Sequence, residues 1–163
     1  MKRFAPYAAL AGLVIVLDQV SKALIVAHVP FYGSVRLIPG FLKLTHIHNK
    51  GAILGLFNSS EYSWAPALLL VLNAAALALV LYYFSKTTDE ERAARFGLAL
   101  IVGGALGNVI DRIARGFVVD FIEMSAGSFH WPTYNIADSC ITIGAVVLVW
   151  SVIFRRPHAS DPV

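Results

Sequence analysis

Charged residues are scarce in this chain. Asp, Glu, Lys and Arg make up 14% of its 163 residues, and hydrophobic residues make up 58%, whereas a soluble domain has about 25% charged residues. This composition indicates a membrane protein. The formal net charge of +3 is small, and the basic residues stand singly or in pairs beside apolar segments. We therefore expect no nucleic-acid partner.

The chain has a single cysteine and lacks the common catalytic and metal-binding motifs. Cys140 is the only cysteine, so no intrachain disulfide can form, and its apolar neighbours predict a small buried side chain. The chain contains no HExxH motif, no Gly-x-Ser-x-Gly motif and no phosphate-binding glycine loop. His46 and His48 are spaced to share one face of a strand, but no third ligand stands beside them, so we expect no metal.

Four segments have the apolar character and the length, about 20 residues, needed to cross a bilayer. They cover residues 4–28, 64–84, 96–113 and 136–154. The first begins like a secretory signal, with Lys2 and Arg3 before an apolar run. Its apolar character resumes after Lys22 and no small-x-small cleavage site follows, so we interpret it as a retained transmembrane helix.

The basic residues at the helix ends predict the orientation of the chain, since four spans place both termini on one side. One side is flanked by Lys2, Arg3, Lys86, Arg92, Arg95, Arg155 and Arg156. The other is flanked by Lys22, Arg36, Lys43, Lys50, Arg112 and Arg115. The positive-inside rule gives most weight to short loops near helix ends, which favours the first side, with both termini, as cytoplasmic.

The connecting segments follow from this orientation. Residues 29–63 and 114–134 are expected outside the membrane, and residues 85–95 and 155–163 inside. Apolar and polar residues alternate over 41–47, which predicts short strands at the outer membrane surface. We therefore predict a single all-α membrane domain with four transmembrane helices and a small extracytoplasmic β-rich subdomain between the first two.

Charged residues gather at the predicted outer ends of these helices. They are Asp18, Lys22, Asp111, Arg112, Asp120 and Asp138. A charged side chain at the bilayer centre costs about 2.5–3.5 kcal/mol even on the insertion scale, which gives the lower values. Asp18 and Lys22 are four residues apart, so they share a helix face and can form a purely structural clamp. Ionised groups in such a position are usually paired, buried between helices or functional.

The ends of the last two helices also allow structural explanations. Asn108, Asp111 and Arg112 form one polar stripe that can satisfy the end of a helix. Asn135 and Asp138 match a helix N-cap followed by an acidic residue in the first turn. The small residues Gly103, Gly104 and Gly107 would let another helix approach closely.

Asp120 is the hardest of the acidic residues to explain structurally. It lies in the apolar stretch 117–121, with no basic residue within three positions, which predicts a raised pKa unless another charge compensates. Asp138 lies at a helix N-terminus, which favours the ionised form. Such a pair can divide acid and base roles between water and a carbonyl. Arg115 and Glu123 are expected to be surface charges.

Five blocks, in this order along the chain, resemble the bacterial lipoprotein signal peptidases (signal peptidase II, aspartic peptidase family A8). The blocks are Asp18-Gln19-Val20-Ser21-Lys22, Asn49-Lys50-Gly51-Ala52, GGALGNVIDR at 103–112, Val118-Val119-Asp120-Phe121 and Asn135-Ile136-Ala137-Asp138. With the length and the four-span layout, the resemblance covers essentially the whole chain. The chain departs from the family at Ile53 and Leu54, where a small residue and an aromatic residue are common.

The resemblance implies an intramembrane aspartic endopeptidase. Its substrates would be diacylglyceryl-modified prolipoproteins, cut on the N-terminal side of the lipidated cysteine to remove the signal peptide. The resemblance assigns catalysis to Asp120 and Asp138. It implies binding or supporting roles for Asp18, Lys22, Asn49, Gly104, Asn108, Asp111, Arg112, Asn135 and Ala137.

The resemblance further implies a place in the bacterial cytoplasmic (inner) membrane, with the active site toward the outer face. It implies no metal or organic cofactor, contact with membrane lipids, and inhibition by cyclic peptides of the globomycin type. We expect a monomer. The alternative is a small transporter or proton-coupled carrier with Asp18, Lys22, Asp111 and Asp120 as a relay. A carrier would place charges near the midplane and often has repeated halves, neither of which is found here.

Overall fold

The computed structural model describes residues 2–51 and 65–154. Predictions that fall on residues 52–64 and 155–163, including those on Ile53 and Leu54, lie outside the described residues. The helices are a short 3-10 turn Lys2–Phe4, α1 (Ala5–His28), α2 (Ala65–Lys86), α3 (Arg92–Arg115) and α4 (Ile136–Ile153). The strands are β1 (Ser34–Ile38), β2 (Leu42–Asn49), β3 (Val118–Ala126) and β4 (Phe129–His130).

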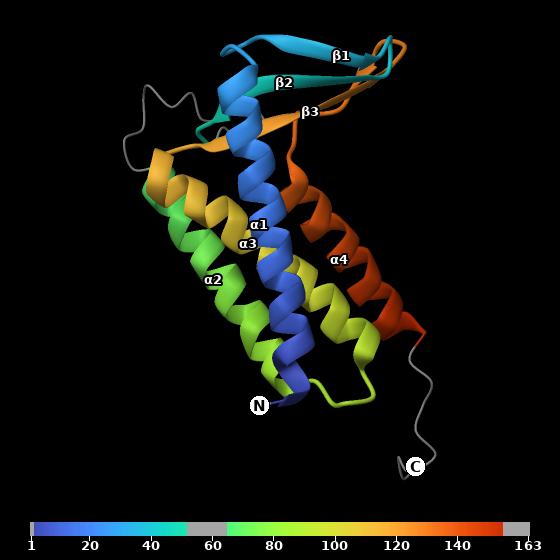
Figure 1. The fold of residues 1–163 in the computed structure, drawn as a ribbon. Coiled ribbons are helices and arrows are strands. Elements are labelled where there is room, and N and C mark those ends of the chain that lie inside the picture. The colour runs from blue at the N-terminus through green and yellow to red at the C-terminus, as the bar shows by residue number, and fades with distance from the viewer. Residues whose placement is uncertain (1, 52–64, 155–163) are drawn as a thin grey trace.

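The helices form a bundle with the sheet across one end (Figure 1). Three of the described helices, α1, α3 and α4, are long and apolar enough to cross a membrane, and the described apolar part of α2 is shorter, Leu70–Lys86. The start of α1 and the end of α4 both lie at the bundle end away from the sheet (Figure 1).

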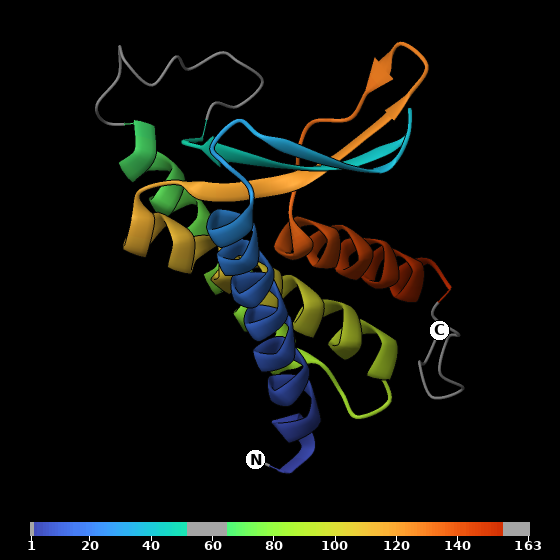
Figure 2. The same ribbon diagram turned by 45° about the horizontal axis from the view of Figure 1, so that its top comes forward.

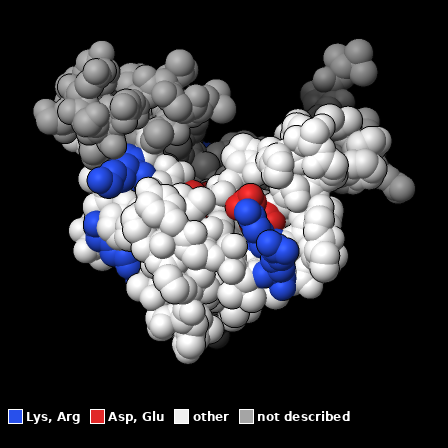
Figure 3. All heavy atoms as spheres, turned by 90° about the horizontal axis from the view of Figure 1, so that it is seen from above, with Lys and Arg blue, Asp and Glu red and all other residues white. Residues whose placement is uncertain are grey.

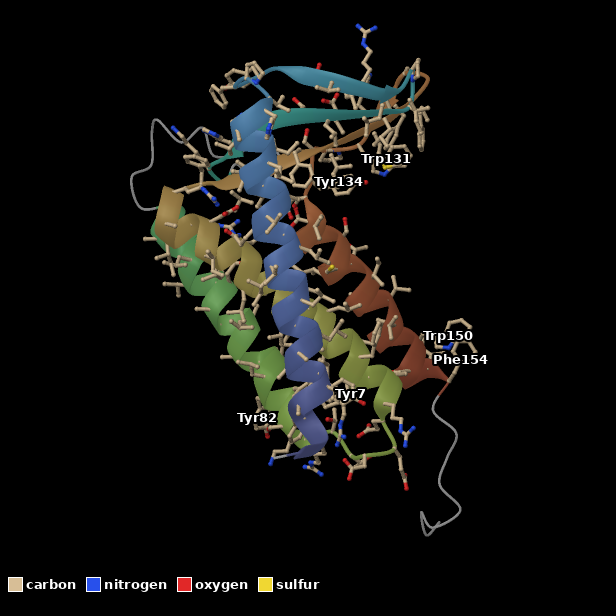
Figure 4. The ribbon with its side chains drawn as sticks, viewed as in Figure 1. Tyr7, Tyr82, Trp131, Tyr134, Trp150 and Phe154 are labelled. Carbon is tan, nitrogen blue, oxygen red and sulfur yellow. The ribbon has the colours of Figure 1, made fainter. Side chains whose placement is uncertain are left out.

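Aromatic side chains mark both ends of the bundle (Figure 4). Figure 4 labels Trp131 and Tyr134 near the sheet, and Tyr7, Tyr82, Trp150 and Phe154 at the opposite end. Such residues favour the two interfaces of a bilayer. Seen from the sheet end, the surface is mostly uncharged, with charged atoms confined to small areas (Figure 3).

Helix α3 is the central helix, packed against α1, α2 and α4. Its glycines allow this packing, as the sequence predicted. A Cβ atom on Gly103 would lie 2.8 Å from the carbonyl oxygen of Ala11 in α1, and one on Gly104 would overlap the carbonyl of Ala137 in α4. Glycine is therefore required on two faces of the same helix.

Helix α3 begins at Arg92, about four residues before the predicted start. Arg95 explains the difference, because this charged residue is buried inside the helix. Its guanidinium donates to the carbonyl oxygen of Thr87 at 2.9 Å and to Asp89 at 2.7 Å. A charge that is fully paired can stay within an apolar helix, so hydropathy alone placed the helix start too late.

The sheet has four antiparallel strands in the order β1-β2-β3-β4 and lies across the ends of the helices (Figure 2). Its first two strands come from the segment predicted to be β-rich. Strands β3 and β4 come from the segment between α3 and α4, which the sequence analysis treated as a loop. Four consecutive residues of β3, from Val118 to Phe121, are buried, so this strand lacks the alternating pattern of a half-buried strand.

A small apolar cluster fixes the sheet to the bundle. Ile25 and Val29, at the end of α1, pack with Val119 and Phe121 of β3. Asp120 lies between the last two, so this packing places its carboxyl group at the junction of sheet and helices.

Candidate active site

Asp138 is positioned by the N-terminal cap of α4. The side chain of Asn135 accepts a hydrogen bond from the backbone N–H of Asp138 at 3.0 Å, and the carboxyl group of Asp138 accepts one from the backbone N–H of Asn135 at 3.4 Å. This capping box confirms the predicted cap. It holds the Asp138 carboxyl group, which is only half-buried, in the first turn of α4.

Asp120 lies on β3 with only 3% of its surface exposed. Its two carboxyl oxygens accept hydrogen bonds from the side-chain amides of Asn135 at 2.7 Å and Asn49 at 2.9 Å. Burial is the main cause that raises the pKa of Asp120, to about 6, and the charge of Asp138 acts in the same direction. The hydrogen bonds from Asn49 and Asn135 and the charge of Lys22 oppose this rise. Asp120 can therefore carry a proton close to neutral pH.

A chain of side-chain amides connects the two carboxyl groups. Asn108 donates to Oδ1 of Asp138 at 2.7 Å, and its own oxygen accepts hydrogen bonds from Asn135 at 3.2 Å and from Lys22 at 3.1 Å. Asn135 also donates to Asp120. Because each amide oxygen is occupied by donors, both NH₂ groups are directed at the carboxyl oxygens.

Lys22 lies at the centre of a buried ionic cluster between α1 and α3. Its ammonium group is 2.7 Å from Oδ2 of Asp18, 2.9 Å from Oδ2 of Asp111 and 3.1 Å from the oxygen of Asn108. Lys22, Asp18 and Asp111 are all fully buried. The three ammonium protons have three acceptors, which a buried lysine needs to stay charged. The predicted pairing of Asp18 with Lys22 is confirmed.

The same two carboxylates also bind backbone amides of the segments that carry Asp120 and Asp138. Oδ1 of Asp18 accepts from the N–H of Ala137 at 3.0 Å, and Oδ2 of Asp111 accepts from the N–H of Val119 at 3.2 Å. Ala137 and Val119 directly precede Asp138 and Asp120. The ionic cluster thus fixes the backbone next to each member of the pair.

Two members of this cluster were missing from the predicted set. Gln19 donates to Oδ1 of Asp111 at 3.2 Å, to Oδ2 of Asp18 at 3.2 Å and to the carbonyl of Gly107 at 3.1 Å. Arg115 is partly exposed, as expected of a surface charge, but its guanidinium also forms an ion pair with buried Asp111, which was not predicted. The four-residue spacing of Asp111 and Arg115 was the available signal.

The cluster is electrically balanced, because the two aspartates of α1 and α3 face the ammonium of Lys22 and the guanidinium of Arg115. This balance offsets part of the cost of burying Asp18, Lys22 and Asp111, while the side chain of Arg115 stays 30% exposed. Glu123, the other expected surface charge, pairs with Lys43 at 2.9 Å on the sheet.

The remaining predicted residues lie around the pair. Arg112 is half-buried, donates to the carbonyl of Asn108 at 3.2 Å, and its charge interacts with Asp138, Asp120 and Asp111. Gly104 packs against the backbone of Ala137, which is fully buried. The structure therefore brings together all the residues predicted for the site, from α1, β2, α3, β3 and α4.

His46 and His48 share one face of β2 and bond to each other, with 3.0 Å between their Nε2 atoms. Nδ1 of His46 lies 2.8 Å from the carbonyl oxygen of Val29, which can only accept, so this nitrogen carries the proton. His48 stacks on Phe117 with ring centroids 3.7 Å apart. Burial, His46 and Lys50 lower the pKa of His48. The two rings thus join β2 to its neighbours beside Asp120.

Comparison with known proteins shows the family to which the chain is similar. The model of the family described as signal peptidase (SPase) II matches residues 10–154. A protein of Desulforapulum autotrophicum named lipoprotein signal peptidase is 41% identical over 144 residues, which are 88% of this chain and 89% of that protein. One of Francisella tularensis subsp. novicida with the same name is 37% identical over 150 residues, 92% of each chain.

The fold is also similar to that of solved membrane enzymes. A bacterial membrane enzyme solved at 1.9 Å resolution superposes with a TM-score of 0.81 at 30% identity, over 93% of this chain and 95% of that one. Another, solved at 2.3 Å, gives a TM-score of 0.82 at 28% identity, over 97% and 95%. With three helices able to span a bilayer, this is a multi-pass membrane protein, and the chain belongs to the signal peptidase II family.

Proposed function

We propose that this chain removes the signal peptide from diacylglyceryl-modified prolipoproteins as an aspartic endopeptidase, with Asp120 and Asp138 as the catalytic pair. Family membership supports the substrate class, since the relatives are named lipoprotein signal peptidases. One observation carries the catalytic assignment. Asn135 donates a hydrogen bond to the buried carboxyl group of Asp120 and also accepts one from the backbone N–H of Asp138. One residue therefore contacts both aspartates, one buried and one half-buried.

The unequal environments assign the two roles. Asp138, at the N-terminus of α4, is the ionised base and takes a proton from a water molecule. Asp120, buried and with a raised pKa, donates its proton to the oxygen of the scissile carbonyl. Water adds to the carbonyl carbon and gives a neutral diol. Asp138 then returns its proton to the leaving nitrogen, the C–N bond breaks, and Asp120 takes back a proton from the diol.

The neighbouring residues support these steps. Asn108 donates to Asp138 at 2.7 Å, which stabilises the ionised base. Asn49 and Asn135 hold the carboxyl group of Asp120. Lys22 and Asp18 are positioning residues, because they act through Asn108 and through the backbone at Ala137.

For the placement in the membrane we propose four transmembrane spans, with α2 as the second. The sheet then lies on the outer face of the bacterial inner membrane, and the start of α1 and the end of α4 face the cytoplasm. Water reaches the pair from the outer surface, while the acyl chains of the substrate stay in lipid. The protein acts as a monomer, and cyclic peptides of the globomycin type occupy the same site.

The carrier alternative is not favoured. Asp18, Lys22 and Asp111 form one ionic cluster that bonds the backbone beside Asp120 and Asp138. Buried Arg95 is paired with Asp89 at the other end of the bundle, so the charges in the described residues form no continuous series across the membrane. A relay through the membrane needs charged groups near the midplane.

Purified protein, incubated with a lipid-modified prolipoprotein and with its unmodified form, tests the proposal. We expect cleavage of the lipidated form only. Asp120→Asn and Asp138→Asn should each lower the rate by at least about 10²-fold, with unchanged insertion and helix content. Glu123→Gln, which removes a partly exposed ion pair with Lys43 on the sheet, is the matched control and should keep full activity. Wild-type rates in either dyad variant would refute the catalytic assignment, and equal cleavage of both substrates would refute the substrate class.

A further inference from the structure

An apolar cavity lies between α1, α2 and α3, at the bundle end away from the sheet. Its volume is about 150 Å³. The lining includes Phe4, Tyr7, Ala8, Leu81, Phe84 and Val102. Figure 4 labels Tyr7 and Tyr82 at this level. Ala11 in the lining precedes Asp18 by seven residues, so the cavity begins about 10 Å along α1 from the buried ionic cluster.

The chemistry of the cavity excludes water and suits a hydrocarbon. Its lining surface is almost entirely carbon, so a water molecule inside would find no hydrogen-bond partners. Ala8 in the lining is exposed, so the cavity opens at the surface of the bundle, where the hydrocarbon of a bilayer would reach it. A space of about 150 Å³ holds a small hydrocarbon such as benzene. The α1 lining extends from Phe4 to Ala11, about 10 Å along the helix axis. An acyl chain in a bilayer runs in this direction.

Two arginines lie beside the ring of Phe4, which lines the cavity at the start of the chain. The guanidinium carbons of Arg3 and Arg95 lie 4.7 Å and 5.1 Å from the centroid of Phe4. Arg95 is buried, and its guanidinium lies 2.7 Å from the carboxylate of Asp89. Arg3 is half-exposed and lies farther from the same carboxylate, at 3.6 Å. Arg3 therefore retains donors that can face an anion outside the protein.

The basic residues at this end of the bundle, Arg3, Lys86, Arg92 and Arg95, outnumber the acidic residues of the adjacent turn, Asp89, Glu90 and Glu91. Asp89 is shared by two guanidinium groups, and a hydrogen bond from Arg95 is the main cause that lowers its pKa. Glu91 in the same turn is directed at the backbone N–H of Thr88 at 2.6 Å. Lys86 and Arg92 add positive charge at this end. Helix ends with excess Lys and Arg attract anionic lipid headgroups.

We propose that this cavity binds a segment of one acyl chain of an anionic phospholipid from the leaflet at this end of the bundle, with the lipid phosphate on Arg3. The cavity supplies a hydrocarbon-sized space along the bilayer normal, and Arg3 supplies a cation within 5 Å of the ring that lines it. The bound lipid fills the space between α1 and α2, where Phe4 and Tyr7 meet Phe84.

Native mass spectrometry of the purified full-length protein tests the site, with phosphatidylglycerol and phosphatidylcholine of identical acyl chains as probes. We expect the wild type to retain one phosphatidylglycerol at least tenfold more tightly than phosphatidylcholine. Ala8→Trp, which fills the cavity, should lower this retention at least tenfold. Ala9→Trp adds the same side chain at a neighbouring exposed position outside the lining, and should leave retention unchanged.

Arg3→Gln separates the two parts of the site. It should abolish the preference for phosphatidylglycerol while the cavity still accepts an acyl chain, and it remains informative if Ala8→Trp does not fold. Equal retention of both lipids by the wild type overturns the proposal, as does equal retention by Ala8→Trp and Ala9→Trp. Peptidase activity is not the readout, so either result leaves the proposed function untouched.

Discussion

Asp120 shows how opposing local effects bring the pKa of a buried carboxyl group near neutrality. Burial raises this pKa, the hydrogen bonds from Asn49 and Asn135 lower it, and the net value is about 6. Without the two amides, the same burial would favour the neutral form over a much wider pH range. The amides therefore set the pH at which Asp120 can exchange a proton.

The first prediction concerns pH. The proposed mechanism needs a protonated Asp120, and a raised pKa means that the proton is lost only as the pH rises through about 6. We expect kcat/KM for a lipidated substrate to fall above that pH, by about tenfold per unit. Asn49→Ala removes a hydrogen bond that lowers the pKa, so it should move this descending limb to higher pH. A limb that stays in place, or that moves to lower pH, contradicts the assignment.

At the scale of elements, α3 holds the site together because two of its faces consist partly of glycine. Gly107 lies against Asp18 of α1, where an added Cβ would be 2.6 Å from Oδ2, and Gly104 lies against Ala137 of α4. Both contacts are with groups that position the proposed catalytic pair. The close packing of these helices is thus a condition for the site as well as for the fold.

Gly104→Ala is predicted to disturb this packing. The added methyl group would overlap the backbone of Ala137 and displace the first turn of α4, at a cost of about 1–3 kcal/mol. Both the thermal midpoint in detergent and kcat should fall. Gly12→Ala in α1 is the matched control, since nothing lies within 4 Å of its added methyl group. Equal melting temperatures for the two variants would refute the prediction.

Local spacing predicted two pairs of side chains in the candidate site, whereas residues such as Asn49 and Ala137 were implied only by the resemblance to the family. The pair of Asp18 with Lys22 and the cap of Asn135 with Asp138 each depend on residues three or four positions apart in one helix. The contact between Asp18 and the backbone N–H of Ala137 joins residues 119 positions apart, and no periodicity encodes it. For the same reason Gln19 was missed, since two of its three partners, Gly107 and Asp111, lie on another helix.

The helices were predicted within a few residues because hydropathy depends only on the local sequence. The strand β3 was missed because it is covered on both faces. The apolar cluster with Ile25 covers Val119 and Phe121 on one face, and Asn135 contacts Asp120 on the other. The pattern of burial along β3 is therefore set by tertiary contacts. Strand propensity depends on such context more strongly than helix propensity does.

At the scale of the whole molecule, the two ends of the bundle differ in kind. The sheet and the ionic cluster of Lys22 occupy one end, and the arginine cluster around Phe4 occupies the other. This asymmetry supports the proposed orientation, with the arginines on the cytoplasmic side.

Cysteine labelling tests this orientation and the spanning of α2 together. In a Cys140→Ser background, Ser34→Cys lies on β1 and Ser85→Cys near the end of α2, both at exposed positions. A membrane-impermeant maleimide added to spheroplasts should label the first, and the second only after permeabilisation. The reverse pattern contradicts the orientation. Labelling of both in intact spheroplasts contradicts a transmembrane α2.

The contacts of Asp18 with Ala137 and of Asp111 with Val119 have a mechanical consequence. The two segments that carry the carboxyl pair are attached to one block around Lys22, so the distance between Asp120 and Asp138 is set by that block. A thicker or thinner bilayer changes the tilt of transmembrane helices. Because helices α1 and α3 are joined at Lys22, such tilting moves both carboxyl groups together and leaves the gap between them unchanged.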